Sequence, residues 1–158
     1  MAIEIERKFL LNNESWRQGV EGVLFRQGYL CTDPERTVRV RLEGEQGKLT
    51  VKGRSIGISR TEFEYDLPKD QAQEMLDTLC LRPLIEKTRY RIEVAGQLWE
   101  IDEFLGENSG LVLAEIELSS VDEAFERPDW LGREVSDDPR YFNSNLVKNP
   151  LACWITDL

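Results

Sequence analysis

Histidine is absent from all 158 residues of this chain. Its absence excludes phosphohistidine intermediates, a histidine general base and zinc held by imidazole nitrogens. Any chemistry must therefore rely on carboxylates, lysine, arginine and tyrosine. The metal ions that such a chain could hold are hard cations bound through oxygen.

Cysteine is scarce: only Cys31, Cys80 and Cys153 occur, with no CxxC spacing. This odd, scattered set favours free thiols in a reducing compartment over a disulfide framework. No apolar run approaches the roughly 20 residues of a membrane span, and the charged start over residues 1–4 lacks the apolar core of a secretory signal. We therefore expect a cytoplasmic protein without a membrane partner.

Positive charge is in deficit, because 30 acidic residues against 20 basic ones give a net charge of -10. This balance argues against nonspecific binding to nucleic acid or to an acidic membrane surface. An anionic ligand would need a local cluster of cations.

Alternating apolar and polar residues dominate the chain, whose length suits one domain over residues 1–158. The alternation predicts eight strands, near residues 3–11, 23–31, 36–43, 47–53, 58–67, 85–94, 97–104 and 111–119. Hairpin-type links at 43–47 and 95–97 indicate a mainly antiparallel sheet.

Helical patterns occur in three places. After Pro68, apolar residues at helical spacing through Leu79 predict an amphipathic helix. Ser120 and Glu123 have the spacing of a capping box, which predicts a short second helix before Pro128. A third helix is expected from residue 143 or 144 to residue 150.

One face of every predicted strand carries charged or polar residues, because strand side chains alternate between two faces. On the first strand, Glu4, Glu6 and Lys8 share one face while Ile5 and Phe9 take the other. The polar face continues through Gln27, Tyr29, Arg39, Arg41, Thr50, Lys52, Glu62, Glu64, Lys87, Arg89, Arg91, Glu100, Asp102, Glu115 and Glu117. The apolar face behind it must be covered by helices or by a partner.

Two interpretations of the polar face remain open. An open antiparallel sheet could simply expose it to solvent. A sheet of eight strands often curls or closes, and closure with the apolar face outward would place every one of these charges in a tunnel. Such buried charges would have to pair with one another, with water, with divalent cations or with a highly charged ligand. A linear polyphosphate suits that arrangement, since carboxylates hold Mg²⁺ or Mn²⁺ and cations hold phosphate oxygens.

A series of charged motifs follows one order along the chain. ExExK at residues 4–8 is followed by RQGYL (26–30), VRVRL (38–42), TVKG (50–53), EKTRY (86–90), EID (100–102) and AEIEL (114–118). Over nearly the whole chain this series resembles the CYTH domain, or triphosphate tunnel metalloenzyme, family. The compact chain, with ExExK at its start, is most similar to the small bacterial inorganic triphosphatases.

The resemblance implies a mainly β (α+β) fold: an eight-stranded antiparallel tunnel barrel with a charged interior and an apolar outer face covered by a few helices. It also implies a divalent cofactor, Mg²⁺ or Mn²⁺, and a small-molecule triphosphate substrate. Family activities include hydrolysis of inorganic triphosphate, thiamine triphosphate or RNA 5'-triphosphate ends, and cyclisation of ATP. The branch most similar to this chain cleaves inorganic tripolyphosphate.

Residue roles follow from the same resemblance. The implied metal ligands are Glu4, Glu6, Asp102, Glu115 and Glu117. The implied phosphate-binding cations, whose charge would stabilise phosphoryl transfer, are Lys8, Arg39, Arg41, Lys52 and Arg89.

The implied catalytic residues are Tyr29, Lys87, Glu62 and Glu64. Lys87 with Tyr29 resembles a pair that family triphosphatases use near the scissile phosphate, where an ammonium would favour phenolate; the alternative is a tyrosine that fills a barrel layer. Either glutamate could orient or deprotonate the attacking water. Arg91 either binds substrate or lies solvated near a mouth.

Other functions remain open. A nucleotide enzyme, such as an adenylate cyclase or a nucleoside or thiamine triphosphatase, would need a base pocket at the tunnel entrance, and no motif identifies one. A noncatalytic polyphosphate-binding module could dispense with the paired carboxylates. We expect no nucleic-acid partner, and a homodimer is one option for assembly. The segment from Arg133 to the last helix is a solvated loop or closes one barrel mouth.

Overall fold

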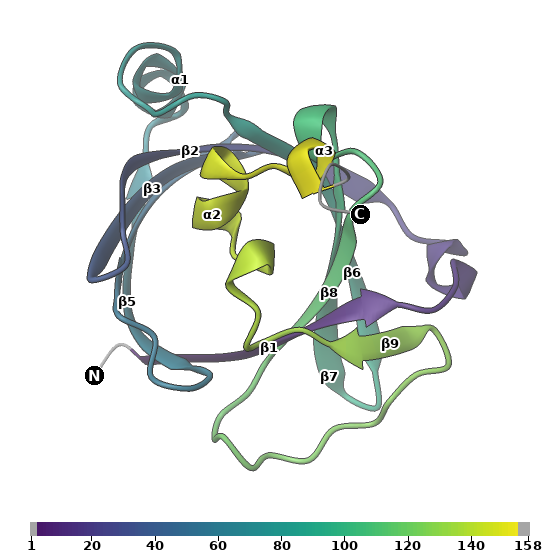
Figure 1. Cartoon of the computed structure of the whole chain (residues 1–158). Coiled ribbons are helices and arrows are strands. Elements are labelled where there is room, and N and C mark those ends of the chain that lie inside the picture. The colour runs from purple at the N-terminus through teal and green to yellow at the C-terminus, as the bar shows by residue number, and fades with distance from the viewer. Residues whose placement is uncertain (1–2, 155–158) are drawn as a thin grey trace.

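A closed β-barrel forms the body of the protein in a computed structural model that describes residues 3–154. Its strands are β1 (Ile3–Leu11), β2 (Gly22–Asp33), β3 (Arg36–Glu43), β4 (Gln46–Gly53), β5 (Ser59–Leu67), β6 (Ile85–Val94), β7 (Gln97–Phe104) and β8 (Val112–Glu117). These eight strands form an antiparallel ring in the order β1-β5-β4-β3-β2-β6-β7-β8, which closes between β8 and β1. The predicted eight-stranded antiparallel barrel is confirmed (Figure 1).

Strand β1 closes the ring because its two ends pair with different partners. Residues Ile3 to Ile5 pair with β5, and Glu6 to Phe9 pair with β8. The register sets Lys8 opposite Glu115. A ninth strand, β9 (Leu131–Glu134), was not predicted; it pairs with the last residues of β1 outside the ring.

Helix α1 (Lys69–Thr78) covers one part of the apolar outer face, as the helical spacing predicted. Ala72 and Leu76 are fully buried against Val40 and Leu42 of β3. Gly47 of β4 permits this approach, since a Cβ there would lie 2.9 Å from the Cβ of Ala72. Neither α1 nor any other helix in residues 3–154 has the length and apolarity needed to cross a membrane.

A chain segment without helix covers another part of the outer face. Residues 118–130 carry Phe125 and Trp130 onto an aromatic cluster with Phe9 and Trp99. The helix predicted from Ser120 and Glu123 is therefore wrong. The Glu123 carboxylate accepts hydrogen bonds from the backbone of Ser119 and the side chain of Gln97, so it ties a turn to β7 instead of capping a helix. The single-turn helix η1 (Ser15–Arg17) adds Trp16 to this cluster.

The C-terminal segment lies inside the ring when the barrel is viewed end-on (Figure 1). It comprises η3 (Pro139–Tyr141), α2 (Asn143–Lys148) and α3 (Leu151–Trp154), and α2 confirms the third predicted helix. Leu146 and Val147 of α2 are buried against Tyr29, Ile85 and other apolar side chains from one end of the barrel. The short helix η2 (Gly106–Asn108) connects β7 to β8 at this end, where Asn108 accepts a hydrogen bond from the backbone of Leu151.

Candidate active site

A cavity of about 310 Å³ runs into the barrel and is lined by residues from all eight strands of the ring. Its depth can be followed along the inward residues of β6. The side chain of Lys87 is 1% exposed, that of Arg89 is 7% exposed, and that of Arg91 is 44% exposed. The cavity is thus closed beyond Lys87, where α2 packs, and open beside Arg91.

Most of the residues that sequence reasoning selected are brought together in this one cavity. Those that line it are Glu4, Glu6, Lys8, Tyr29, Arg39, Arg41, Lys52, Glu62, Glu64, Lys87, Arg89, Arg91, Glu115 and Glu117. Asp102 is the exception. It is completely buried against Lys87 and Arg89 and does not line the cavity.

Asp102 forms what we call the paired cluster with Lys87 and Arg89. Its Oδ1 and Oδ2 accept from Nε and Nη2 of Arg89 at 2.7 and 2.8 Å, and its Oδ2 lies 2.8 Å from Nζ of Lys87. Burial alone would raise the pKa of Asp102, but the two cations outweigh it and hold that pKa far below its ordinary value. Both oxygens of Asp102 are thus in contact with cations of the protein, and its role as a metal ligand stays a prediction.

Glu115 also forms ion pairs with cations of the protein. Its carboxylate lies 3.4 Å from Nζ of Lys8 and 3.8 Å from Nη2 of Arg89. Burial works to raise the pKa of Glu115, yet the Lys8 ammonium and the nearby Arg89 bring it down to about 2. Nζ of Lys8 also donates to the backbone oxygen of Tyr141 at 3.1 Å, which ties β1 to the C-terminal segment.

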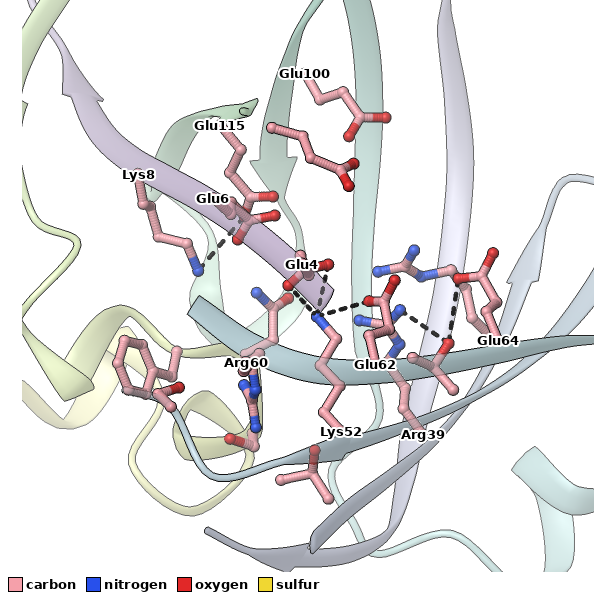
Figure 2. A pocket seen from close by; sticks show the side chains of 18 of the residues that line it. Glu4, Glu6, Lys8, Arg39, Lys52, Arg60, Glu62, Glu64, Glu100 and Glu115 are labelled. Atoms are coloured by element: carbon pink, nitrogen blue, oxygen red, sulfur yellow. Dashed lines mark hydrogen bonds and ion pairs between the residues drawn. The ribbon is translucent and has the colours of Figure 1, made fainter. Parts of the chain in front are cut away.

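Three carboxylates, which we call the acidic wall, keep raised pKa values because the nearby cations compensate their charge only in part: Glu4, Glu6 and Glu117. Burial, together with the negative charges of Glu115 and Glu4, raises the pKa of Glu6 to about 8. Burial also raises the pKa of Glu4 and of Glu117, and neighbouring carboxylates add to the effect. Figure 2 shows a cation that reaches into this wall, Lys52, whose Nζ lies 2.9 Å from Glu4 and 3.3 Å from Glu62.

Positive charge gathers at Arg39 and Arg41 of β3, which we call the cationic wall. Within residues 3–154, Arg39 forms no ion pair; its Nη2 donates to Oγ1 of Thr50 at 3.2 Å, and its Nε is buried without a hydrogen-bond partner. Burial and the like charges of Arg39 and Arg89 lower the pKa of Arg41 to about 10. Glu43 offsets part of this effect, since its Oε2 lies 3.2 Å from Nη1 of Arg41. The positive charge that remains here, above all on Arg39, is charge that an anion would relieve.

Phe25 lies beneath this cationic region and was missed in the sequence. Its ring centroid is 5.1 Å from the guanidinium carbon of Arg41, 4.8 Å from that of Arg89 and 5.8 Å from that of Arg91. A ring face attracts cations, so Phe25 supports the three guanidiniums. Its position two residues before Gln27, on the same strand face, was the signal that could have found it.

The donor set of the acidic wall fits a hard divalent cation, because three crowded carboxylates would be relieved by positive charge. No group of three acidic, cysteine or histidine side chains in residues 3–154 is already gathered closely enough to hold an ion. In this structure Lys52 forms an ion pair with Glu4, and Lys8 forms one with Glu115.

Lys87 and Tyr29 both line the cavity, but within the described residues no hydrogen bond or ion pair joins them. The Lys87 ammonium instead contacts Asp102 and donates to Oδ1 of Asn143 at 3.0 Å. Burial lowers the pKa of Lys87 to about 7 against the opposing charge of Asp102. Glu62 and Glu64 both line the cavity from β5, as predicted, and Glu62 is held by Lys52.

Two further lining residues escaped the sequence analysis. Arg60 lies opposite Glu4 in the β1–β5 pairing, and its guanidinium donates to the backbone oxygen of Gly53 at 2.9 and 3.1 Å. Its place two residues before Glu62 was a usable signal. Asn143 enters from the C-terminal segment, and no strand periodicity could have placed it here.

Fold and site together define an eight-stranded tunnel barrel in which an acidic wall and a cationic wall line one polar cavity. A sequence model of the CYTH domain matches residues 2–144, and the chain belongs to this family.

Relatives extend the match over nearly the whole chain. A protein of Acetivibrio thermocellus named inorganic triphosphatase is 55% identical over 150 residues, covering 95% of this chain and 96% of that protein. An inorganic triphosphatase of Nitrosomonas europaea is 40% identical over 149 residues, covering 91% and 96%. The crystal structure of an inorganic triphosphatase superposes with a TM-score of 0.65 at 37% identity, covering 90% of this chain and 96% of that chain.

Proposed function

We propose that this protein hydrolyses inorganic tripolyphosphate to pyrophosphate and phosphate, with Mg²⁺ or Mn²⁺ as cofactor. The observation that carries the proposal is the presence of two walls of opposite charge in one cavity, each only partly compensated by the protein: the pKa of Glu6 is raised to about 8 and that of Arg41 is lowered to about 10. A polyphosphate chain accompanied by a divalent cation relieves both. The two relatives named inorganic triphosphatase support this choice of substrate.

Substrate binding is assigned to the cations around the cavity. Arg39 and Arg41 offer guanidinium donors from β3, Lys52 offers an ammonium from β4, and Lys8 and Arg89 lie deeper. Phosphoryl transfer needs mainly positioning and stabilisation of charge on the phosphate oxygens. Fixed cations in a largely buried site supply both without reorganising during the reaction.

The metal is assigned to Glu4, Glu6 and Glu117, which Glu115 adjoins on β8. When bound, a divalent cation supplies charge neutralisation at the phosphate oxygens and a water of lowered pKa. Glu62 and Glu64, on the neighbouring strand β5, are proposed to orient or deprotonate the attacking water. Each carboxylate is an adequate base for a water already held in place.

Lys87 and Tyr29 are proposed to act at the deep end of the chain of phosphates. A buried amine with a pKa of about 7 can give or accept a proton near neutral pH. The Tyr29 side chain is 5% exposed and lines the same cavity. Its hydroxyl is proposed to position the reacting phosphate.

A phosphate-release panel tests the proposal. Tripolyphosphate, ATP, thiamine triphosphate and pyrophosphate are compared with Mg²⁺ and with Mn²⁺, and cyclic AMP is assayed in the ATP samples. We expect tripolyphosphate to be cleaved fastest, because the walls are polar and offer few favourable contacts to the added bulk of adenosine. Preferential conversion of ATP to cyclic AMP would identify a cyclase, and binding of tripolyphosphate without any turnover would identify a noncatalytic module.

A further inference from the structure

Asn143 is the first residue of α2 and brings an amide group to the closed end of the cavity. Its Oδ1 accepts hydrogen bonds from Nε2 of Gln27 at 3.0 Å and from Nζ of Lys87 at 3.0 Å. Both of these donors belong to completely buried side chains. These hydrogen bonds connect the C-terminal segment to Gln27 of β2 and to Lys87 of β6.

The orientation of the Asn143 amide follows from Arg41, which begins a chain of hydrogen bonds that runs through Gln27 to Asn143. Nε of Arg41 donates to Oε1 of Gln27 at 2.9 Å. A guanidinium can only donate, so the oxygen of Gln27 must face Arg41 and its NH₂ group must face Asn143. The oxygen of Asn143 must then face Gln27, and its own NH₂ group points elsewhere.

That NH₂ group is a donor that solvent can reach and that the protein does not bury. Within residues 3–154, no hydrogen-bond partner is present for Nδ2 of Asn143, although the neighbouring Phe142 and Ser144 line the cavity with it. A polar group at a binding cavity that the protein leaves without a partner is suited to a ligand atom. Because the amide can only donate there, the matching ligand atom is an acceptor such as a phosphate oxygen.

The position of Asn143 indicates which phosphate it would meet. Beyond it, Leu146 and Val147 fill the barrel with Tyr29 and Ile85, so no chain of phosphates can continue past this point. The group beside Asn143 must be the end of the chain. A phosphoryl group esterified on its outer oxygen would not fit against this packing.

We propose that Asn143 is a substrate-binding residue whose NH₂ group donates to the unesterified terminal phosphoryl group at the closed end of the tunnel. This inference rests on the proposed function and deepens it. It makes the substrate class one of linear polyphosphates with at least one free terminal phosphate. It also assigns the hydrogen bonds from Gln27 and Lys87 the role of fixing the amide in its donating orientation.

The test compares Asn143→Asp with Asn143→Ala and with Asn149→Ala, a control at an exposed position after the same helix. Aspartate keeps the oxygen that Gln27 and Lys87 contact but replaces the donor by a negatively charged acceptor. We expect kcat/KM for tripolyphosphate to fall about 10- to 100-fold in both Asn143 variants, the range for a lost hydrogen bond to a charged group. Asn143→Asp should lose at least as much as Asn143→Ala, and Asn149→Ala should match the wild type.

A binding measurement separates this inference from the proposed function. In EDTA, tripolyphosphate should raise the Tm of the wild type, and raise it less in both Asn143 variants. Wild-type binding without turnover would overturn the proposed function. The inference would then be decided by the difference in Tm shift between the wild type and the Asn143 variants. Wild-type kcat/KM and an undiminished Tm shift in Asn143→Asp would overturn the inference, because the oxygen alone would then be sufficient. P1,P3-di(adenosine) triphosphate should not be cleaved, and its hydrolysis at the tripolyphosphate rate would also contradict the inference.

Discussion

The paired cluster and the two walls use the same residue types but leave their charges in different states. In the paired cluster, every oxygen of Asp102 meets a cation of Lys87 or Arg89 within 2.8 Å. In the acidic wall, Glu6 has mainly carboxylates around it, and in the cationic wall Arg39 has no ion-pair partner within residues 3–154. The charges of the first region are paired within the fold, and we propose that those of the second are completed by a ligand.

This difference separates stability from binding. A buried ion pair is costly to break because the remaining partner becomes an uncompensated buried charge. Like charges held together against burial destabilise the folded protein until a ligand of opposite sign relieves them, which is why such groups concentrate at functional sites. Mutations in the paired cluster should therefore reduce folding stability most, and mutations in the walls should change binding most.

The largest effect is expected for Asp102→Ala. Removing this carboxylate leaves Lys87 and Arg89 buried without their partner, which should cost about 3–5 kcal/mol and lower Tm by roughly 10 °C in a calorimetric scan. The control is Glu45→Ala, which removes an exposed partner of Lys69 and should cost less than about 1 kcal/mol. Equal Tm losses in the two variants would refute the distinction between the paired cluster and a surface ion pair.

The next largest effect is expected for Arg39→Ala, measured as activity. This guanidinium lacks an ion pair, so its loss should leave Tm near the wild-type value while kcat/KM for tripolyphosphate falls about 30- to 1000-fold. Arg36→Ala removes a guanidinium that is 69% exposed on the same strand and serves as the control. If both variants retained wild-type kcat/KM, Arg39 would have no role in holding the substrate.

A smaller effect is expected for Glu6→Gln in metal-free buffer, and it should depend on pH. The folded pKa of about 8 lies above the ordinary value of 4.5, so the contribution of Glu6 to stability is complete below about pH 4.5 and is lost as pH rises through about 8. Glutamine imitates the protonated form. We expect Glu6→Gln to raise Tm by a few degrees, about 1 kcal/mol, at pH 8.5 and to leave it unchanged at pH 5.

Glu74→Gln on the exposed face of α1 is the control for this pH dependence and should leave Tm unchanged at both pH values. A gain in Tm that is as large at pH 5 as at pH 8.5 would show that repulsion at Glu6 is not its cause.

Much of the barrel and its charged interior could be predicted because strand alternation is a local signal. The same parity placed Glu4, Arg39 and Lys87 on one inner surface without knowledge of which strands are neighbours. Which charges pair with each other could not be predicted, since that depends on register between strands. The ion pair between Asp102 and Arg89 is an example, because it depends on their lying opposite each other in the β6–β7 pairing.

The place of the C-terminal segment at the cavity could not be predicted from the sequence, for a different reason. Asn143 contacts Gln27 and Lys87 across 116 and 56 residues of sequence, and no periodic pattern carries such contacts. The helix expected at Ser120 failed because Glu123 found partners outside its own turn. By contrast, the closed end had a readable signal: the inward positions Ile85 and Phe104 turn apolar next to the charged Lys87 and Asp102.

The most direct test of the central claim, that the acidic wall is completed by a divalent cation, is a titration of Tm with Mn²⁺ at pH 8. A cation that binds the folded protein alone raises Tm progressively with its concentration. The account predicts such a rise in the wild type, a strongly reduced rise in Glu6→Gln, and an unchanged rise in Glu74→Gln. A flat Tm in the wild type, or equal rises in all three proteins, would contradict it.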